Sequence, residues 1–265
     1  MYNYQSICNQ VIEIVKETAQ FQRREYDKLN RADVAFKDKN DLVSYVDIES
    51  EKYLIDKLKP LIIGAEFLAE EGHADIDCLR DQAIWIIDPL DGTTNYVHQV
   101  PVFSISVALY VNKKAVIGVV YEVIRDECFY AWQDSPSFLN GKEIHVKEND
   151  SIQNALIGTG FPIKNFEVKE SYLRIFSELI EKSRGLRRLG SAAVDLAYVS
   201  CGRYDAFFEY NLNPWDVAAG LFIVQQAGGE VSDFSGGDNY LFGKQILAAS
   251  SALFKDMQRL IEEKK

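Results

Sequence analysis

The most informative segment of the chain is Ala83-Ile-Trp-Ile-Ile-Asp-Pro-Leu-Asp-Gly-Thr-Thr-Asn-Tyr96. Its apolar run, residues 84–87, predicts a short strand that is buried on both faces. We expect this strand to end at Asp88-Pro89, because proline cannot donate to a sheet ladder and Asp-Pro favours a turn. Open α/β sheets place their sites at the carboxyl ends of strands. The turn after this strand is therefore the first candidate functional site.

The turn can aim two carboxylates, Asp88 and Asp91, at one point beside the Leu90 carbonyl. The backbone N–H groups of Gly92, Thr93 and Thr94 follow directly and can bind an anion at the start of a helix. Oxygen ligands for a hard cation next to an anion site are typical of a metal-dependent phosphatase. The alternative is an acidic surface turn, since turns rich in Asp, Pro and Gly are common.

Composition limits the classes of function. The 265 residues, 47% of them hydrophobic and 26% charged, suit one large globular domain or two small ones that share an interface. The net charge of −11, from 29 basic and 40 acidic residues, disfavours direct binding to nucleic acid or to an anionic membrane. An anionic substrate would need bound divalent cations to enter an acidic site.

The cysteines and the apolar runs indicate a cytoplasmic location. The four cysteines are scattered without a Cys-x-x-Cys pair, which favours reduced, packing residues. Polar residues interrupt the N-terminal segment, so it does not resemble a signal peptide, and no apolar run has the length of a membrane span. We expect a soluble, cytoplasmic protein with no membrane partner.

Periodicity predicts strands that alternate with helices around a central meander, which indicates an α/β or layered α+β protein. The first half is expected to hold a helix over 3–28, a helix capped by Asp47, a strand at 61–65 and the meander over 102–132. The second half is expected to hold a helix over 169–183, a strand at 204–209 and a helix over 217–227 with Asp216 as its N-cap.

Several phosphate chemistries are excluded by missing motifs. Gly243-Lys244 lacks the upstream glycine and the following hydroxyl of a P-loop. Asp88 and Asp91 are one residue too far apart for a nucleophilic Asp-x-Asp pair, and no Gly-x-Ser-x-Gly elbow occurs. Water activated by a metal remains as the nucleophile.

Three blocks together resemble the inositol monophosphatase family of magnesium-dependent, lithium-sensitive phosphomonoesterases. They are Ala69-Glu-Glu-Gly72, Trp85-Ile-Ile-Asp-Pro-Leu-Asp-Gly-Thr-Thr-Asn95 and Trp215-Asp-Val-Ala-Ala-Gly220, joined by 190–193 and 204–209. The resemblance covers nearly the whole chain. It implies a layered αβαβα sandwich of the inositol monophosphatase and fructose-1,6-bisphosphatase type, commonly a homodimer. It also implies one domain over 1–265, with an N-terminal half to about residue 150 and a C-terminal half from 151.

The resemblance implies two or three Mg²⁺ ions. Glu70, Asp88 and the Leu90 carbonyl match the ligands of a first metal, and Asp88, Asp91 and Asp216 match those of a second. A third metal in the family is held through water by Glu70. Converging carboxylates without cations would repel by roughly 4 kcal/mol per close pair at an effective dielectric of about 20, and Mg²⁺ offsets this charge.

The resemblance also implies catalytic and substrate-binding residues. Thr93 and Glu70 match the pair that orients the attacking water, Asp47 matches the acid that holds the threonine, and Lys37 matches a loop lysine near the metals. The implied substrate-binding residues are Leu90, Asp91, Gly92, Thr93, Arg187, Gly190, Ser191, Ala192, Glu209 and Asp216.

The sequence favours inositol 1-phosphate as the substrate, because Thr93-Thr94-Asn95 resembles inositol monophosphatases more than the nucleotide phosphatases of the group. Fructose-1,6-bisphosphatase, histidinol-phosphate phosphatase and nucleotide 3′-phosphatase activities are the alternatives. Glu209 is expected to accept hydrogen bonds from ring hydroxyls and to repel a second phosphate. A hypothesis of another class is a regulatory partner of the transcription machinery, which some relatives also contact.

Overall fold

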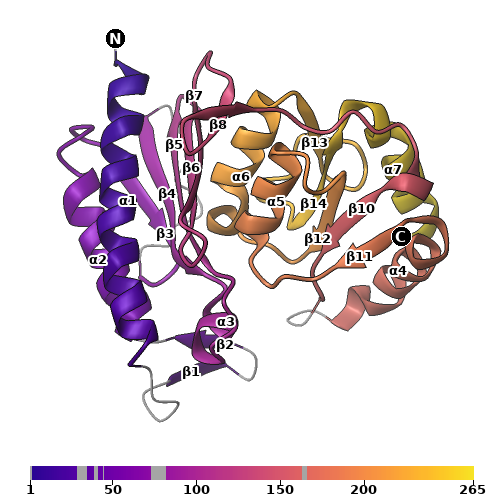
Figure 1. The fold of residues 1–265 in the computed structure, drawn as a ribbon, viewed down its shortest axis with the longest axis horizontal. Helices are drawn as coiled ribbons and strands as arrows, with labels where there is room; N and C mark the ends of the chain where they lie inside the picture. The colour runs from indigo at the N-terminus through magenta and orange to yellow at the C-terminus, as the bar shows by residue number, and fades with distance from the viewer. Residues whose placement is uncertain (1, 29–34, 39–40, 44, 73–81, 163–165) are drawn as a thin grey trace.

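The structure is a computed structural model, which describes residues 2–28, 35–38, 41–43, 45–72, 82–162 and 166–265. Five layers follow one another across the molecule (Figure 1). The helix layers are α1 Tyr4–Tyr26 with α2 Tyr45–Leu58, α5 Ala192–Ser200 with α6 Pro214–Gln226, and α4 Lys169–Lys182 with α7 Ser251–Lys264. A seven-stranded sheet and a five-stranded sheet separate these helix layers. The expected αβαβα sandwich is confirmed.

The larger sheet has the strand order β3-β4-β5-β6-β7-β8-β9. Its strands are β3 Glu66–Ala69, β4 Ala83–Asp91, β5 Ser104–Val111, β6 Lys114–Glu122, β7 Glu127–Trp132, β8 Ser137–Leu139 and β9 Lys142–Ile144. β3 runs parallel to β4, and the remaining neighbours are antiparallel. The meander that the β-rich runs predict is therefore confirmed as β5, β6 and β7.

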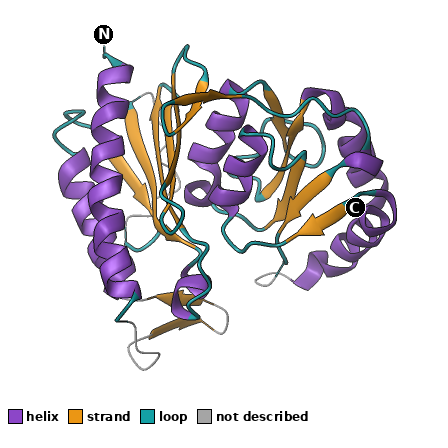
Figure 2. Cartoon of the chain, viewed as in Figure 1, coloured by secondary structure: helices purple, strands orange, loops and turns teal. Residues whose placement is uncertain are grey.

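The smaller sheet has the order β11-β10-β12-β14-β13. Its strands are β10 Leu156–Thr159, β11 Gly185–Arg187, β12 Ala206–Tyr210, β13 Gly229–Ser232 and β14 Gln245–Ser250. A hairpin of β1 Ala35–Asp38 and β2 Asp41–Val43 lies with the short helix α3 Thr93–Val97 at one end of the molecule (Figure 2). Two 3₁₀ helices, η3 Ile152–Asn154 and η4 Phe166–Val168, flank β10 and α4.

The central helices bring the two halves of the chain together. Every residue of α5 is buried, because this helix lies between the two sheets and needs apolar residues on all sides. Its neighbour α6 approaches the larger sheet closely, since a Cβ on Gly118 of β6 would lie 2.8 Å from the Ala219 carbonyl oxygen. A Cβ on Gly220 would likewise lie 2.7 Å from Leu196 of α5. Glycine at these two positions therefore permits the packing that places α6 against the sheet.

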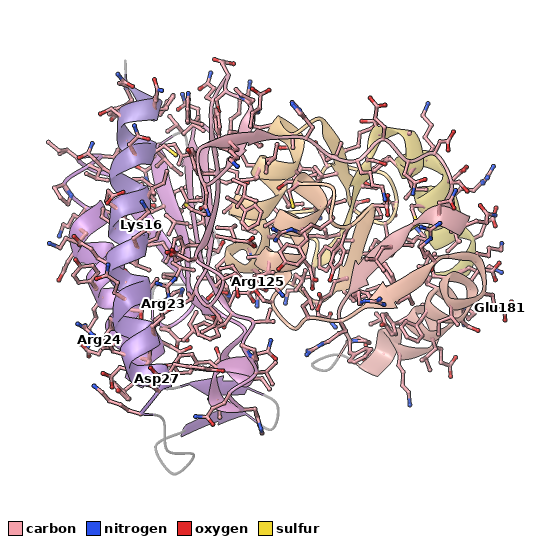
Figure 3. All side chains as sticks on the ribbon, in the orientation of Figure 1. Lys16, Arg23, Arg24, Asp27, Arg125 and Glu181 are labelled. Carbon is pink, nitrogen blue, oxygen red and sulfur yellow. The ribbon has the colours of Figure 1, made fainter. Side chains whose placement is uncertain are left out.

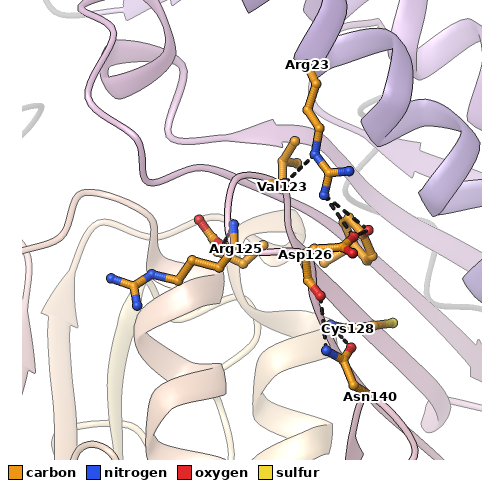
Figure 4. Close-up of polar contacts among 8 residues, drawn as sticks. Arg23, Val123, Arg125, Asp126, Cys128 and Asn140 are labelled. Atoms are coloured by element: carbon orange, nitrogen blue, oxygen red, sulfur yellow. Dashed lines mark hydrogen bonds and ion pairs between the residues drawn. The ribbon is translucent and has the colours of Figure 1, made fainter.

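The outer helix α1 is bonded to the turn between β6 and β7 (Figure 4). Lys16, Arg23 and Arg24 follow one another down this helix, and Asp27 is its C-cap residue (Figure 3). Arg23 donates from Nε to the Val123 carbonyl at 2.6 Å and pairs through Nη2 with Asp126 Oδ1 at 2.9 Å. Although ion pairs at partly exposed sites contribute little to stability, the bond to a backbone carbonyl sets the position of the helix along the sheet.

Two strand predictions differ from the structure. Residues 61–65 form turns, with Ile63 92% exposed, and the strand begins only at Glu66. β4 does not end at Asp88-Pro89, because Asp88 pairs with Ser106 and Asp91 with Ser104 across a shift in register. This irregularity accommodates Pro89 inside a central strand, as bulges do.

Two helix starts also differ from the prediction. α2 begins at Tyr45, so Asp47 lies in its first turn rather than at its N-cap. α6 begins at Pro214, and Asp216 closes a capping box with Asn213, which is the N-cap residue. Both aspartates therefore lie one turn further into their helices than propensity alone predicts.

Candidate metal and phosphate site

Three carboxylates converge where β4 meets the start of α6. Asp88, Asp91 and Asp216 each offer an oxygen atom within 4.8 Å of the others. Asp88 and Asp91 come from the bulged end of β4 and are 1% and 9% exposed, whereas Asp216 comes from the first turn of α6. Residues more than 120 positions apart in the chain therefore form one acidic cluster, as the motif blocks predict.

Hydrogen bonds from the protein fix each carboxylate. Asp88 Oδ1 accepts from the Leu90 amide at 2.9 Å, and Asp216 Oδ2 accepts from the Asn213 amide at 2.6 Å. Asp91 Oδ2 accepts from Ser191 Oγ at 2.6 Å and from the Ala193 amide at 2.7 Å. Since Ser191 is the N-cap of α5, this pair joins β4 directly to the middle helix layer.

The charged forms of these buried carboxylates are unfavourable unless a cation is bound. Burial raises the pKa of Asp88 well above its usual value, and the charges of Glu70, Asp91 and Asp216 raise it further. Burial likewise raises the pKa of Asp91 to about 6, against the lowering effect of its hydrogen bond from Ser191. A divalent cation would reverse this penalty, and an all-oxygen donor set suits a hard ion. The residues therefore fit Mg²⁺.

Glu70 lies beside the cluster. Ala69 of β3 pairs with Ile87 of β4, so the chain leaves β3 at Glu70 next to Asp88. Glu70 lines the same cavity as Asp91 and Asp216, and its charge acts on Asp88. The structure thus brings Glu70 to the site without placing it among the three tightly grouped carboxylates.

Thr93 connects the bulge to α2. Its Oγ1 lies 3.0 Å from Asp47 Oδ1 and 3.1 Å from the Leu90 carbonyl oxygen, and it can donate to either. Asp47 is fully buried, so its partner must come from within the protein. The contact between Asp47 and Thr93 that the resemblance implies is present. Lys37 lies on β1, but its side chain is outside the part of the chain that the structure describes.

Gly92 brings the start of α3 close to two other backbone segments. Its φ of 100° lies in the left-handed region, and a Cβ there would meet the carbonyl oxygens of Gly190 and Val102 at 3.2 Å. Glycine is therefore required both by conformation and by space. The close approach places the amides at the start of α3 in the wall of the cavity that also holds Gly190.

Gln22 supports the bulge from α1, a role that the sequence analysis missed. Its Nε2 donates to the Pro89 carbonyl at 2.7 Å and to Ser50 Oγ at 3.1 Å, and the side chain is fully buried. The signal was present in the sequence, because Gln22 continues the spacing of the apolar face of this helix and is, with Thr18, one of two buried polar residues on it.

A cavity extends from the carboxylates toward the smaller sheet. Of the predicted substrate-binding residues, those that line it are Asp91, Gly92, Thr93, Gly190, Ser191, Ala192, Glu209 and Asp216. Leu90 is buried beneath it, and its carbonyl faces Thr93. Lining residues that the sequence analysis missed include Phe161, Arg188, Asn211 and Asn213.

The arginine at the cavity is Arg188 rather than the predicted Arg187. Arg187 is exposed on β11, and its Nη1 donates to the adjacent Leu186 carbonyl. Arg188 follows the strand, lines the cavity and lies 5.5 Å from the centre of the Phe161 ring. Both arginines are exposed, and only Arg188, which directly follows the strand, lines the cavity.

Glu209 lines the cavity from β12 of the smaller sheet. Burial raises its pKa well above the usual value and Asp216 raises it further, while Arg188 lowers it. Within the described residues, no hydrogen-bond donor contacts its carboxylate. A Cβ on Gly160 would lie only 1.9 Å from Glu209 Oε1, so the carboxylate occupies the space that this glycine leaves open. Glu209 is therefore placed to accept hydrogen bonds from a ligand.

Comparison with known proteins shows the family of the chain. The sequence model of the inositol monophosphatase family matches residues 3–264. The chain belongs to the inositol monophosphatase family. It is similar to Nus factor SuhB of Pseudomonas aeruginosa, with 36% identity over 262 residues, covering 97% of this chain and 96% of that protein.

Solved structures of the family share the fold. Extragenic suppressor protein suhB from Bartonella henselae matches with a TM-score of 0.89 and 33% identity, over 97% of this chain and 99% of the other. Inositol monophosphatase from Anabaena (Nostoc) sp. PCC 7120 matches with a TM-score of 0.88 and 28% identity, over 99% and 98%. Among the described residues, no helix is both long enough and apolar enough to cross a membrane.

Proposed function

We propose that the chain is a Mg²⁺-dependent phosphomonoesterase that hydrolyses inositol 1-phosphate to inositol and phosphate. The observation that carries the proposal is the convergence of Asp88, Asp91 and Asp216 beside the amides that begin α3. Cation ligands and an anion site thus share one cavity. Membership of the inositol monophosphatase family supports this activity.

In this proposal the carboxylates and the Leu90 carbonyl hold the metal. Bound Mg²⁺ supplies positive charge to the phosphate and lowers the pKa of a bound water. Asp88, Asp91 and Asp216 are the central ligands, and Glu70 completes the set from β3. The amides of Gly92 and Thr93 orient the phosphate toward the same point.

Thr93 and Glu70 prepare the attacking water. The Thr93 hydroxyl proton points to Asp47 or to the Leu90 carbonyl, which leaves its oxygen as an acceptor on the cavity side. Glu70, which directly follows β3, offers a second acceptor in the same cavity, so the two groups can hold both hydrogens of the water. The water oxygen would then bond to phosphorus while the ester P–O bond breaks, and the proton that the water gives up would pass to the leaving inositol oxygen, so that one water yields inositol and phosphate.

Glu209 selects the substrate in this proposal. A desolvated carboxylate at the far wall accepts hydrogen bonds from polyol hydroxyls, and a substrate that lacks them leaves it unpaired. The same charge disfavours a second phosphate. The test compares kcat/KM for inositol 1-phosphate, fructose 1,6-bisphosphate, histidinol phosphate and 3′-AMP. Inositol 1-phosphate should lead, and a leading bisphosphate would contradict the substrate assignment while leaving the metal site intact.

A second candidate function, regulatory binding to the transcription machinery, is favoured by the name Nus factor that the Pseudomonas relative carries. The sequence predicted a small phosphorylated substrate and a second copy of the chain as the partners. The name of this relative suggests that a protein of the transcription machinery is a further partner. Pull-down from native cytosol with wild type and with Asp88→Asn separates the two functions. Partners retained by the inactive variant indicate a role independent of catalysis. The homodimer and the cytoplasmic location remain predictions.

A further inference from the structure

Two buried serines on β5 face the aspartates of β4. Ser104 pairs in register with Asp91, and Ser106 pairs with Asp88. Both serines point to the same face of the sheet, since they are two residues apart on one strand. They are 0% and 1% exposed, so each hydroxyl needs a partner within the protein. Both partners lie across the layer boundary, on the central helices.

The hydrogen bond between Ser104 and Ser191 has a direction that Asp91 determines. Ser191 Oγ donates to Asp91 Oδ2 at 2.6 Å, and a serine hydroxyl has only one hydrogen. Ser104 Oγ lies 3.1 Å from Ser191 Oγ, so Ser104 must be the donor when Asp91 is ionised. Ser191 is also the N-cap of α5 and accepts from the Val194 amide. The hydrogen bond from Ser104 thus orients the Ser191 hydroxyl. This hydroxyl in turn holds Asp91 and caps the start of α5.

Ser106 makes the equivalent connection to α6. Its Oγ donates to the Trp215 carbonyl at 3.2 Å. Trp215 immediately precedes Asp216 in the first turn of α6, so the bond fixes the backbone that carries the third carboxylate. One strand therefore anchors both helices whose first turns complete the acidic cluster.

We propose that Ser104 and Ser106 are positioning residues that set the distances between the metal-binding carboxylates, Ser104 through α5 and Ser106 through α6. The proposal rests on the metal site of the proposed function. Groups that orient metal ligands typically contribute about 10- to 100-fold in metal affinity or activity. Apart from Tyr110, the other residues of β5 are aliphatic, and the two serines are the small polar residues on this buried strand.

The test measures Mg²⁺ affinity by calorimetry together with the melting temperature of the metal-free protein. The variants are Ser104→Ala, Ser106→Ala and the double variant. Ser137→Ala is the matched control, because Ser137 is fully buried on β8 of the same sheet and its Oγ donates to the Ile223 carbonyl at the other end of α6. We expect each single variant to bind Mg²⁺ about tenfold more weakly, and the double variant about 100-fold.

The control should lose a comparable amount of stability and keep the affinity of wild type. If wild type binds Mg²⁺ and the Ser104 and Ser106 variants bind it equally well, the inference is wrong and the proposed function stands. Equal weakening by Ser137→Ala would also overturn it, because the effect would then come from general loosening of α6. A wild type without Mg²⁺ affinity would contradict both proposals.

Discussion

The two walls of the cavity are built in different ways. On the metal wall, the carboxylates of Asp88, Asp91 and Asp216 each accept hydrogen bonds from the protein. On the far wall, Glu209 contacts no hydrogen-bond donor among the described residues, and Arg188 stacks on the half-exposed Phe161. The fold pre-organises the carboxylates of the first wall, whereas the second wall offers a carboxylate, Glu209, with acceptor capacity left for a ligand.

This difference separates catalysis from selection. Pre-organised charges act on the reacting phosphate, which every phosphomonoester presents in the same form. A carboxylate such as Glu209, which accepts no hydrogen bond within the described part of the chain, responds to the remainder of the substrate, which differs from one phosphomonoester to another. Substitutions on the metal wall should therefore reduce turnover of all substrates alike, whereas substitutions on the far wall should change their order.

The largest effect is expected from Asp88→Asn. This carboxylate lies at the centre of the cluster, so its loss should lower kcat by at least about 10³-fold, beyond the 10- to 100-fold of groups that only orient ligands. The metal-free variant should melt at a higher temperature than wild type, because a buried charge with three acidic neighbours has been removed. Steady-state kinetics and thermal denaturation in EDTA check both statements. Near-normal kcat would contradict the central position of Asp88.

Thr93→Ala should separate binding from chemistry on the same wall. The hydroxyl contacts Asp47 and Leu90 but is no ligand in our account, so calorimetry should show Mg²⁺ affinity close to wild type. Turnover should fall by about 10²-fold for all substrates, since the attacking water loses one acceptor. A variant that loses Mg²⁺ affinity and kcat together would place Thr93 among the structural supports of the metal.

Glu209→Gln should change the order of substrates. We expect kcat/KM for inositol 1-phosphate to fall about tenfold, because a neutral amide is a weaker acceptor than a desolvated carboxylate. The value for fructose 1,6-bisphosphate should fall less or rise, since repulsion of the second phosphate is removed. Glu230→Gln, the same change at an exposed position of β13, is the control. An equal fall of kcat/KM for all substrates would show that Glu209 does not select among them.

The smallest effect concerns a buried acid that belongs to neither wall. Glu122 of β6 is fully buried, and burial raises the pKa of its carboxyl to about 7, against a hydrogen bond from the Arg125 amide. The folded protein therefore holds a proton that the unfolded chain releases near pH 4.5, and the associated stability is lost as the pH rises to about 7. Glu122→Gln keeps the neutral form at every pH.

We expect Glu122→Gln to melt like wild type at pH 5 and about 2–4 °C higher at pH 8, which corresponds to about 1 kcal/mol for a domain of this size. The comparison uses melting curves of both proteins in EDTA, and adding Mg²⁺ should leave the gap between them unchanged. If the two melting temperatures differed at pH 5 and became equal at pH 8, the pH dependence would be the reverse of the expected one and would contradict the raised pKa of Glu122.

The sequence allowed the fold and the metal wall to be predicted because their signals are local. The apolar run of β4 and the two aspartates that follow it lie within one segment, and Asp216 lies in the first turn of a helix that has its own capping signal. Pro89 misled the prediction of the strand end, because only pairing with β5 reveals that a bulge accommodates it. The strand predicted at 61–65 failed for a related reason, since apolar residues in a turn resemble a short strand.

The supports and the far wall were harder to predict, since they depend on contacts between distant segments. Ser104 contacts Ser191 and Ser106 contacts Trp215, pairs separated by 87 and 109 residues. A single serine in an apolar strand carries no local sign of its partner. Arg188 was missed in favour of Arg187, because the sequence does not show which of two adjacent arginines faces the cavity.

Metal dependence of phosphate release tests the central claim most directly. Wild type is stripped with EDTA, incubated with inositol 1-phosphate, and measured again after Mg²⁺ is restored, with and without Li⁺. We predict no release in EDTA, recovery with Mg²⁺ and inhibition by Li⁺, because the clustered carboxylates need a hard cation before phosphate can approach. Full activity in EDTA would contradict the account.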